Sequence, residues 1–271
     1  MEPFTCRTCR TCAVQHAAGD GPPERCAICE DERQYVGWSG QRWATLAELR
    51  GEGFRTEIRD VEDGLVGIGV EPRLGIGQRA LLVRTPGGNV LWDCIGLIDD
   101  AAVQRVRQQG GIAGIAMSHP HFYGCVVEWS RAFGGAPIYV PRADLPWLMR
   151  PDDAVVPWEG SVEPVPGVTV VQCGGHFEGS AVLHWPGGAD GRGALLTGDS
   201  ISVVQDRRFV SFMRSYPNFI PLPRAEVERV AAAVRPLAFD RIYGGWWDSV
   251  VATGGKEAVE RSAERYLRWI E

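Results

Sequence analysis

Cysteine spacing near the N-terminus is the feature that most constrains the fold of this chain of 271 residues. The five cysteines concerned are Cys6, Cys9, Cys12, Cys26 and Cys29. A Cys-x-x-Cys pair followed by a second such pair is the spacing of a zinc site built from four thiolates. Both Cys6/Cys9 and Cys9/Cys12 have the interval of the first pair, so the spacing leaves that pair open. Because so short a segment buries little apolar surface, zinc binding would supply its folding energy.

The composition is that of a globular protein, with 45% hydrophobic and 23% charged residues. A net charge of -6 argues against a nucleic-acid partner, because nucleic-acid binding relies on a basic face. No apolar run approaches the roughly 18 residues of a membrane span, and the opening MEPFTCRTCR lacks the pattern of a secretory signal. We therefore expect a cytoplasmic protein that acts on a small molecule, with no nucleic-acid or membrane partner; association into a homo-oligomer stays open.

Beyond the cysteines, the hydrophobic pattern predicts strands and helices in alternation. Strands are expected at 65–70, 80–84, 90–93, 112–117, 137–140, 168–173, 181–185, 194–197 and, as the last one, 240–243. Helices are expected at 43–50, 100–109, 128–133, 224–234 and 256–270. Hairpins followed by strand–helix alternation indicate a layered α/β fold with mixed sheets. We expect three parts: a zinc module at 1–36, a linker with a short helix at 37–64, and a main domain at 65–271.

Three of the five histidines and one aspartate directly follow predicted strands. They are His119, His121, His176 and Asp199. In an extended chain His119 and His121 point to the same side, because they are two residues apart. Loops at strand ends are where α/β folds place their chemistry. Three imidazoles and a carboxylate are a ligand set for a transition metal, so the sequence predicts a metal site here.

These four residues lie in motifs that resemble those of the metallo-β-lactamase superfamily. His119-Pro120-His121 is similar to the start of its His-x-His-x-Asp-His motif, and Gly175-His176 to its third-histidine motif. Thr197-Gly198-Asp199 is similar to its Gly-Asp motif. Leu91-Trp92-Asp93 resembles an early strand whose aspartate supports the metal ligands. The resemblance implies a four-layer αββα metallo-β-lactamase fold for residues 65–271.

The N-terminal segment resembles a module found in some uncharacterised proteins of that fold. The similar stretches are CRTC and PPERCAICEDERQYVGW. In those modules the two pairs are separated by the interval found here between Cys12 and Cys26. The resemblance therefore implies four zinc ligands, with Cys6 outside the site: Cys9, Cys12, Cys26 and Cys29. Four thiolates leave zinc no open position, so this zinc would be structural.

The departures from the superfamily pattern concern its second metal. Tyr123 and Gly124 stand where the motif has aspartate and histidine, and the stretch 242–247 has glycine where a final histidine is expected. The second metal position would keep only Asp199, so we expect a mononuclear centre. One zinc on three histidines still lowers the pKa of its water to about 7. Iron also suits histidines with a carboxylate, so zinc and iron both remain open.

We expect a metal-dependent hydrolase of an ester, thioester or lactone, in which Asp199 acts as fourth ligand or as base. Tyr123 either offers a phenol to the reaction or fills the emptied pocket together with Trp246 and Trp247. The residues expected to face the substrate are Tyr216, Asn218 and Trp246. Two other functions stay open: a mononuclear non-haem iron oxygenase, and a non-catalytic binding or scaffold protein that kept the fold.

Overall fold

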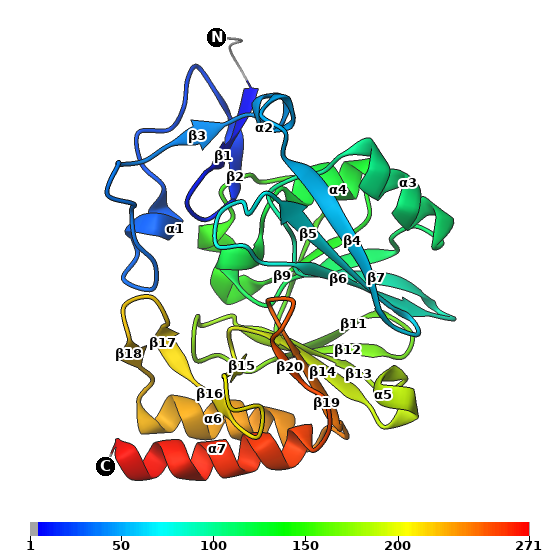
Figure 1. The fold of residues 1–271 in the computed structure, drawn as a ribbon, viewed down its shortest axis with the longest axis vertical. Coiled ribbons are helices and arrows are strands. Elements are labelled where there is room, and N and C mark those ends of the chain that lie inside the picture. Colours follow the sequence, from blue (N-terminus) through cyan, green and yellow to red (C-terminus); the bar gives the residue numbers. More distant parts are fainter. Residues whose placement is uncertain (1–4, 271) are drawn as a thin grey trace.

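Two stacked β-sheets form the centre of the molecule (Figure 1). The computed structural model describes residues 5–270. The first sheet has the order β10-β9-β8-β7-β6-β5-β4 and the second β11-β12-β13-β14-β19-β20. Strands of the first are β4 (Arg55–Glu62), β5 (Leu65–Glu71), β6 (Ala80–Thr85), β7 (Gly88–Trp92), β8 (Gly114–Ala116), β9 (Ile138–Pro141) and β10 (Val155–Trp158). Strands of the second are β11 (Ser161–Val165), β12 (Val168–Gln172), β13 (Ala181–Trp185), β14 (Ala194–Gly198), β19 (Arg241–Gly244) and β20 (Val250–Val251).

Helices cover the outer face of each sheet. The first sheet carries α3 (Asp100–Gln108) and α4 (Val126–Ala132), and the second carries α6 (Arg224–Val234) and α7 (Gly255–Trp269). The main domain also has three short helices: the 3-10 helices η1 (Pro120–Phe122) and η2 (Arg142–Trp147), and α5 (Gly188–Gly191). It has two short hairpins as well, formed by β15 (Ser202–Val203) with β16 (Val210–Ser211) and by β17 (Met213–Ser215) with β18 (Ile220–Pro221). The layers are therefore helix, sheet, sheet, helix, which confirms the predicted four-layer αββα fold.

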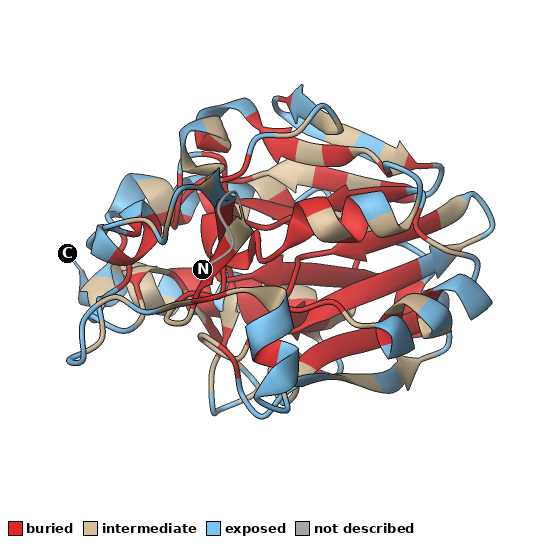
Figure 2. Cartoon of the chain, turned by 90° about the horizontal axis from the view of Figure 1, so that it is seen from above, coloured by how far each residue is buried: buried red, intermediate tan, exposed pale blue. Residues whose placement is uncertain are grey.

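Alternation along the strands explains this layering. Leu81 and Val83 of β6 pack between the two sheets, whereas Leu82 belongs to the cluster beneath α3 and α4. On β14, Leu196 faces the other sheet and Leu195 faces α6 and α7. Because successive side chains of a strand point to opposite faces, each sheet buries both of its faces. Figure 2 shows the result, with strands buried along most of their length and helices exposed on their outer sides.

The cysteine-rich segment forms a small unit beside the first sheet (Figure 1). It contains a three-stranded sheet, β2-β1-β3, and two helices. Its elements are β1 (Thr5–Cys9), β2 (Gln15–Gly19), α1 (Ala27–Glu30), β3 (Trp43–Ala44) and α2 (Leu46–Gly51). The backbone N–H of Gln15 donates to Gly124 O at 2.9 Å, and Ala17 N donates to Met149 O at 3.1 Å. The first bond attaches the unit to the turn just after η1, and the second attaches it to the segment just after η2.

The helix expected at 43–50 begins later, at Leu46. Thr45 caps it: Glu48 N donates to Thr45 Oγ1, and the Glu48 carboxylate accepts from Thr45 N. This capping box satisfies two backbone donors that a helix start leaves unpaired. The residues before the cap, Trp43 and Ala44, pair with β1 as a strand instead.

Four strands of the two large sheets lie outside the predicted set: β4, β10, β11 and β20. Strand β4 occupies 55–62 inside the segment expected to be a linker, and pairs along its length with β5. Most of its side chains are charged, so it lacks the alternation that indicates a half-buried strand. Strand β20 follows β19, which was expected to be the last strand, and pairs with it. Among residues 5–270, no helix has the length and apolar character of a membrane span.

Candidate metal sites

Four cysteine side chains converge in the N-terminal unit. Their sulfur atoms all lie within 4.8 Å of one another, and each residue is buried. They are Cys9 at the end of β1, Cys12 in the following turn, Cys26 before α1 and Cys29 within α1. Cys6 is not part of this cluster. The structure therefore brings together the four cysteines that the resemblance implied.

Polar groups surround the sulfur atoms. Gln41 Nε2 donates to Cys9 Sγ at 2.9 Å, Thr11 N donates to the same sulfur at 3.4 Å, and His16 Nε2 lies 3.5 Å from Cys26 Sγ. Burial raises the pKa of the Cys12 thiol well above its usual range. Four thiolates so close together would repel one another unless a cation lay between them, so the cluster fits a tetrahedral metal ion. Nothing in the cysteine spacing had pointed to His16 or Gln41.

The three histidines and the aspartate also meet, at the ends of three strands. His119 and His121 follow β8, His176 follows β12, and Asp199 follows β14. Their ligand atoms lie within 4.8 Å of one another, and all four residues are buried. His121 lies in the 3-10 turn η1 rather than in extended chain, so a turn brings it beside His119, with their ring centroids 4.9 Å apart.

Hydrogen bonds determine which nitrogen atoms face the middle of this cluster. His176 Nδ1 donates to Met213 O at 3.0 Å, which leaves Nε2 without a proton and 3.2 Å from His121 Nδ1. His119 Nδ1 bonds Ser118 Oγ at 2.8 Å, and its Nε2 lies 3.6 Å from Asp199 Oδ2. Such partners on the far nitrogen are the usual support of a metal-ligating histidine.

Unpaired buried atoms show that the cluster fits a cation. His119 Nε2, His121 Nε2 and Asp199 Oδ1 are buried with no hydrogen-bond partner in the described part of the chain. Burial lowers the pKa of His176 to about 4 and raises that of Asp199 to about 7. Neutral imidazoles with free lone pairs beside a carboxylate are the donor set that zinc or iron accepts.

Asp93 supports the strand end that carries His119 and His121. It follows β7 with a φ of 61°, a region that few non-glycine residues adopt, and its Oδ1 accepts from Ser118 N at 2.7 Å. Burial raises the pKa of Asp93 to about 8, and the nearby Asp199 charge acts in the same direction. The carboxylate therefore orients the backbone next to the histidines, in the position expected for it.

Tyr123 packs in the apolar cluster between the first sheet and its helices. Its hydroxyl has no hydrogen-bond partner in the described residues, and burial raises its pKa well above the usual range. Trp246 reaches the histidines through one ring: its ring centroid lies 5.8 Å from that of Phe122, which in turn lies 4.8 Å from that of His119. Trp247 instead lies against β5 below Arg59, 4.2 Å from the guanidinium carbon.

Two of the three residues expected to face a substrate, Tyr216 and Asn218, donate hydrogen bonds to backbone carbonyl groups. Tyr216 Oη donates to Asp199 O at 3.0 Å, and its ring lies 5.9 Å from that of His176. Asn218 Nδ2 donates to Glu32 O and to Gln34 O, each at 2.9 Å. Tyr216 therefore orders the aspartate loop, and Asn218 attaches the β17–β18 hairpin to the cysteine unit.

Arg33 and Phe177 are the neighbours of the histidines that sequence reasoning missed. Arg33 Nε donates to His176 O at 2.7 Å, and Phe177 lies 5.0 Å from His121 between ring centroids. Phe177 follows His176 in the chain, so its position was a usable signal. Arg33 belongs to the cysteine unit, and no feature of the sequence connects it with a histidine far along the chain.

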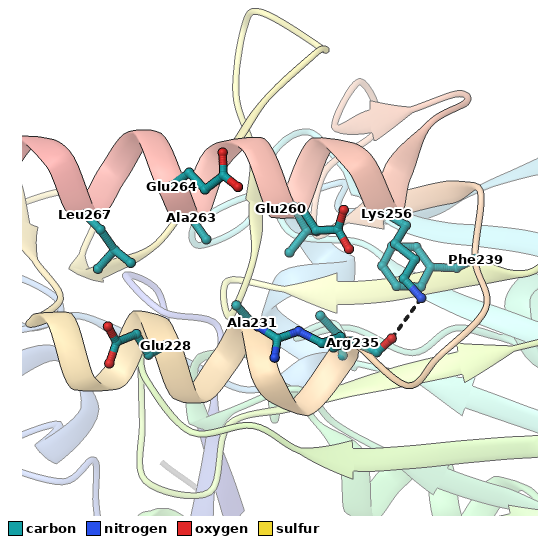
Figure 3. A pocket seen from close by; sticks show the side chains of 11 residues that line it. Glu228, Ala231, Arg235, Phe239, Lys256, Glu260, Ala263, Glu264 and Leu267 are labelled. Carbon is teal, nitrogen blue, oxygen red and sulfur yellow. Dashed lines mark hydrogen bonds between the residues drawn. The ribbon is translucent and has the colours of Figure 1, made fainter.

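A surface groove of about 320 Å³ lies elsewhere, between α6 and α7 (Figure 3). Apolar side chains such as Val259 line it, and Lys256 at one end donates to Arg235 O at 2.8 Å. Neither metal-ligand cluster contributes a residue to its lining.

Comparison with solved structures assigns the architecture. VMB-1 superposes with a TM-score of 0.59 at 12% identity, covering 80% of this chain and 99% of that one. The metallo-β-lactamase FIM-1 from Pseudomonas aeruginosa, solved in its mono-zinc form, gives 0.57 at 16% identity, covering 79% and 96%. TMB-1 gives 0.59 at 14% identity over 80% and 99%. The protein thus has the metallo-β-lactamase fold with an added cysteine cluster.

A sequence relative specifies the family. The uncharacterized protein YmaE of Bacillus subtilis (strain 168) is 47% identical over 262 residues, which cover 96% of this chain and 95% of that protein. The chain therefore belongs to the same family as YmaE. No model of a known protein family matches it.

Proposed function

We propose that this protein is a metal-dependent hydrolase of an ester, thioester or lactone, with one metal ion held by His119, His121, His176 and Asp199. The observation that carries the proposal is the convergence of these ligand atoms within 4.8 Å at the sheet edge. The solved structures named above include metallo-β-lactamases, which supports hydrolysis as the reaction class. Fold alone does not determine the substrate.

Packing where a second metal would lie supports a mononuclear centre. A Cβ placed on Gly245 would be 2.4 Å from Phe122 Cζ, and a Cβ on Gly124 would be 2.3 Å from Ile95 O. Gly124 stands where the superfamily motif has its later histidine, and Gly245 lies where a final histidine was expected. A side chain at either position would collide with its neighbours, which supports the proposal that the second set of ligands is missing.

The residues around the centre fit hydrolysis. A metal ion on three neutral imidazoles lowers the pKa of water to about 7 and polarises a carbonyl group. Asp199 Oδ1, buried and unpaired, is the group that would accept a proton from the attacking water. Tyr216, through its bond to Asp199 O, keeps that carboxylate in place.

For the cysteine cluster we propose a structural zinc, because four thiolates leave no open coordination position. The partners proposed for the protein are a small-molecule substrate and, where copies associate, a second chain. Neither a nucleic acid nor a membrane is proposed as a partner.

Metal content tests the proposal directly. Elemental analysis of protein purified without chelator should give two zinc ions per chain, and the loaded protein should hydrolyse simple ester, thioester or lactone substrates. One zinc with one iron per chain would contradict the hydrolase and favour the iron oxygenase, whose activity is measured by oxygen uptake. One zinc alone would favour a scaffold protein, and three metals would contradict the mononuclear assignment.

Removing a single ligand separates the two clusters. His121→Ala should lose one metal per chain and all hydrolysis, because it deletes a ligand from the histidine centre while leaving the cysteines intact. His184→Ala is the matched control, since His184 Nε2 donates to Ala238 O at 2.7 Å, outside both clusters. Full activity of His121→Ala without that metal would contradict the proposed function.

A further inference from the structure

The loop after α1 of the cysteine unit lies beside the histidine centre. Arg33 Nε donates to His176 O at 2.7 Å, and Ser215 Oγ donates to Arg33 O at 3.0 Å. Glu32 of the same loop pairs with Arg214, and Asn218 bonds the backbone on both sides of Arg33. The loop is thus held between the segment that carries His176 and the β17–β18 hairpin.

The Arg33 guanidinium is rigidly held and has donors left over. Its carbon lies 4.1 Å from the centroid of Phe177, the ring that packs on the histidines, and the side chain is only 11% exposed. Nη1 donates to Asp31 Oδ1 at 2.7 Å. Nη2 has no hydrogen-bond partner within residues 5–270. A guanidinium offers five N–H donors, and those seen here are fixed on a carboxylate and a backbone carbonyl.

The charge of Arg33 acts on the centre itself. It contributes to lowering the pKa of each of His119, His121 and His176. Arg33 is partly buried and pairs with Asp31 through Nη1, so Nη2 is the donor left for a further anionic group.

We propose that Arg33 binds a carboxylate group of the substrate while the histidine centre acts on the bond to be cleaved, so that the cysteine unit supplies part of the substrate site. This inference rests on the proposed function. A flat guanidinium fork matches a carboxylate in shape and charge. Because Arg33 already pairs with Asp31, a singly charged carboxylate suits it better than a doubly charged phosphate.

A matched pair of small thiols tests the proposal. Mercaptoacetate and mercaptoacetamide have the same thiol to bind zinc, but only mercaptoacetate carries a charge. By calorimetric titration, zinc-loaded wild type should bind mercaptoacetate more tightly. Arg33→Gln should reduce that preference by about tenfold or more, the usual effect of losing a hydrogen bond to a charged group. Arg33→Lys, which keeps the charge but loses the fork, should give a smaller reduction.

Two variants make the outcome specific. Arg55→Gln removes an exposed cation away from this loop, where it pairs with Glu71, and should leave the preference unchanged. His121→Ala should bind neither thiol. An unchanged preference in both Arg33 variants, or equal binding of the two thiols by wild type, would overturn the inference and leave the proposed function standing. Failure of both thiols to bind zinc-loaded wild type would overturn the proposed function and the inference with it.

Discussion

A neutral imidazole is the form of histidine that binds a metal, and burial holds the three clustered histidines in that form. Desolvation is the largest cause of the lowered pKa of His119, His121 and His176. The same desolvation raises the pKa of Asp93 to about 8 and of Asp199 to about 7, because it opposes the charged carboxylate. A cation at the centre would lower the pKa of these carboxylates again, because it favours their charged form. Metal binding and ionisation of the two aspartates are therefore coupled.

Asp144 gives a stability prediction away from the ligands. Burial raises its pKa to about 6 from an ordinary value of 3.8, although Gly179 N donates to its Oδ1. The folded state therefore binds its proton more tightly, so this contribution to stability is present below pH 3.8 and lost as pH rises through 6. Relative to Asp144→Asn, wild type should lose on the order of 1 kcal/mol between about pH 5 and 7, measured by urea unfolding. Asp63→Asn, which removes an exposed carboxylate, should show no such difference; a wild-type advantage that grows with pH would contradict the assignment.

At the scale of elements, the loop after β19 packs directly on the turn that carries His121. Gly245 leaves space for the Phe122 ring, which also contacts His119 at 4.8 Å between centroids. The Trp246 ring also packs against Phe122, and its Nε1 donates to Ile76 O at 3.1 Å. Aromatic side chains therefore fill the space beside Gly245.

Gly245→Ala should destabilise the protein by about 1–3 kcal/mol, because its Cβ would overlap Phe122 in a packed region. Phe122→Leu in the same chain should recover part of that loss, which makes the two effects non-additive. Urea unfolding of the four proteins of this cycle provides the measurement. Gly37→Ala is the matched control, since nothing lies within 4 Å of its added Cβ. Additive effects of the two changes would show that Phe122 does not determine the space at Gly245.

Across the whole molecule, the cysteine unit and the main domain are joined by packing as well as by hydrogen bonds. A Cβ on Gly75 would lie 2.7 Å from Ala13 Cβ, and one on Gly96 would lie 2.5 Å from Ala13 O. Arg33 then joins the unit to His176. The N-terminal unit therefore contributes contacts beside the histidine centre.

Cys26→Ser should lose one metal ion per chain and loosen both the N-terminal unit and the loop around His176. The reason is that the metal supplies the folding energy of the unit, which in turn holds that loop. Elemental analysis with hydrogen exchange would show both effects. Cys6→Ser, which changes a cysteine outside the cluster, should alter neither. Full protection of the His176 loop in Cys26→Ser would show that the two parts are independent.

Strand-end position alone pointed to the histidine cluster, whereas the choice of the four cysteines and the four-layer fold came from the family resemblance. The two cysteines of each pair are close together in the sequence. Each clustered histidine comes just after a hydrophobic run whose composition predicts a strand. Strand β4 was not predicted because its mostly charged sequence lacks the alternation that indicates a strand. The helix at 46–51 was predicted to start too early, because Thr45 caps it and the residues before the cap are not helical. The contacts that connect the two clusters depend on atoms far apart in the chain: Arg33 and His176 are separated by 143 positions, and Phe122 meets Gly245 across the two sheets. No local pattern encodes such contacts, because they form only once both sheets and the cysteine unit have packed.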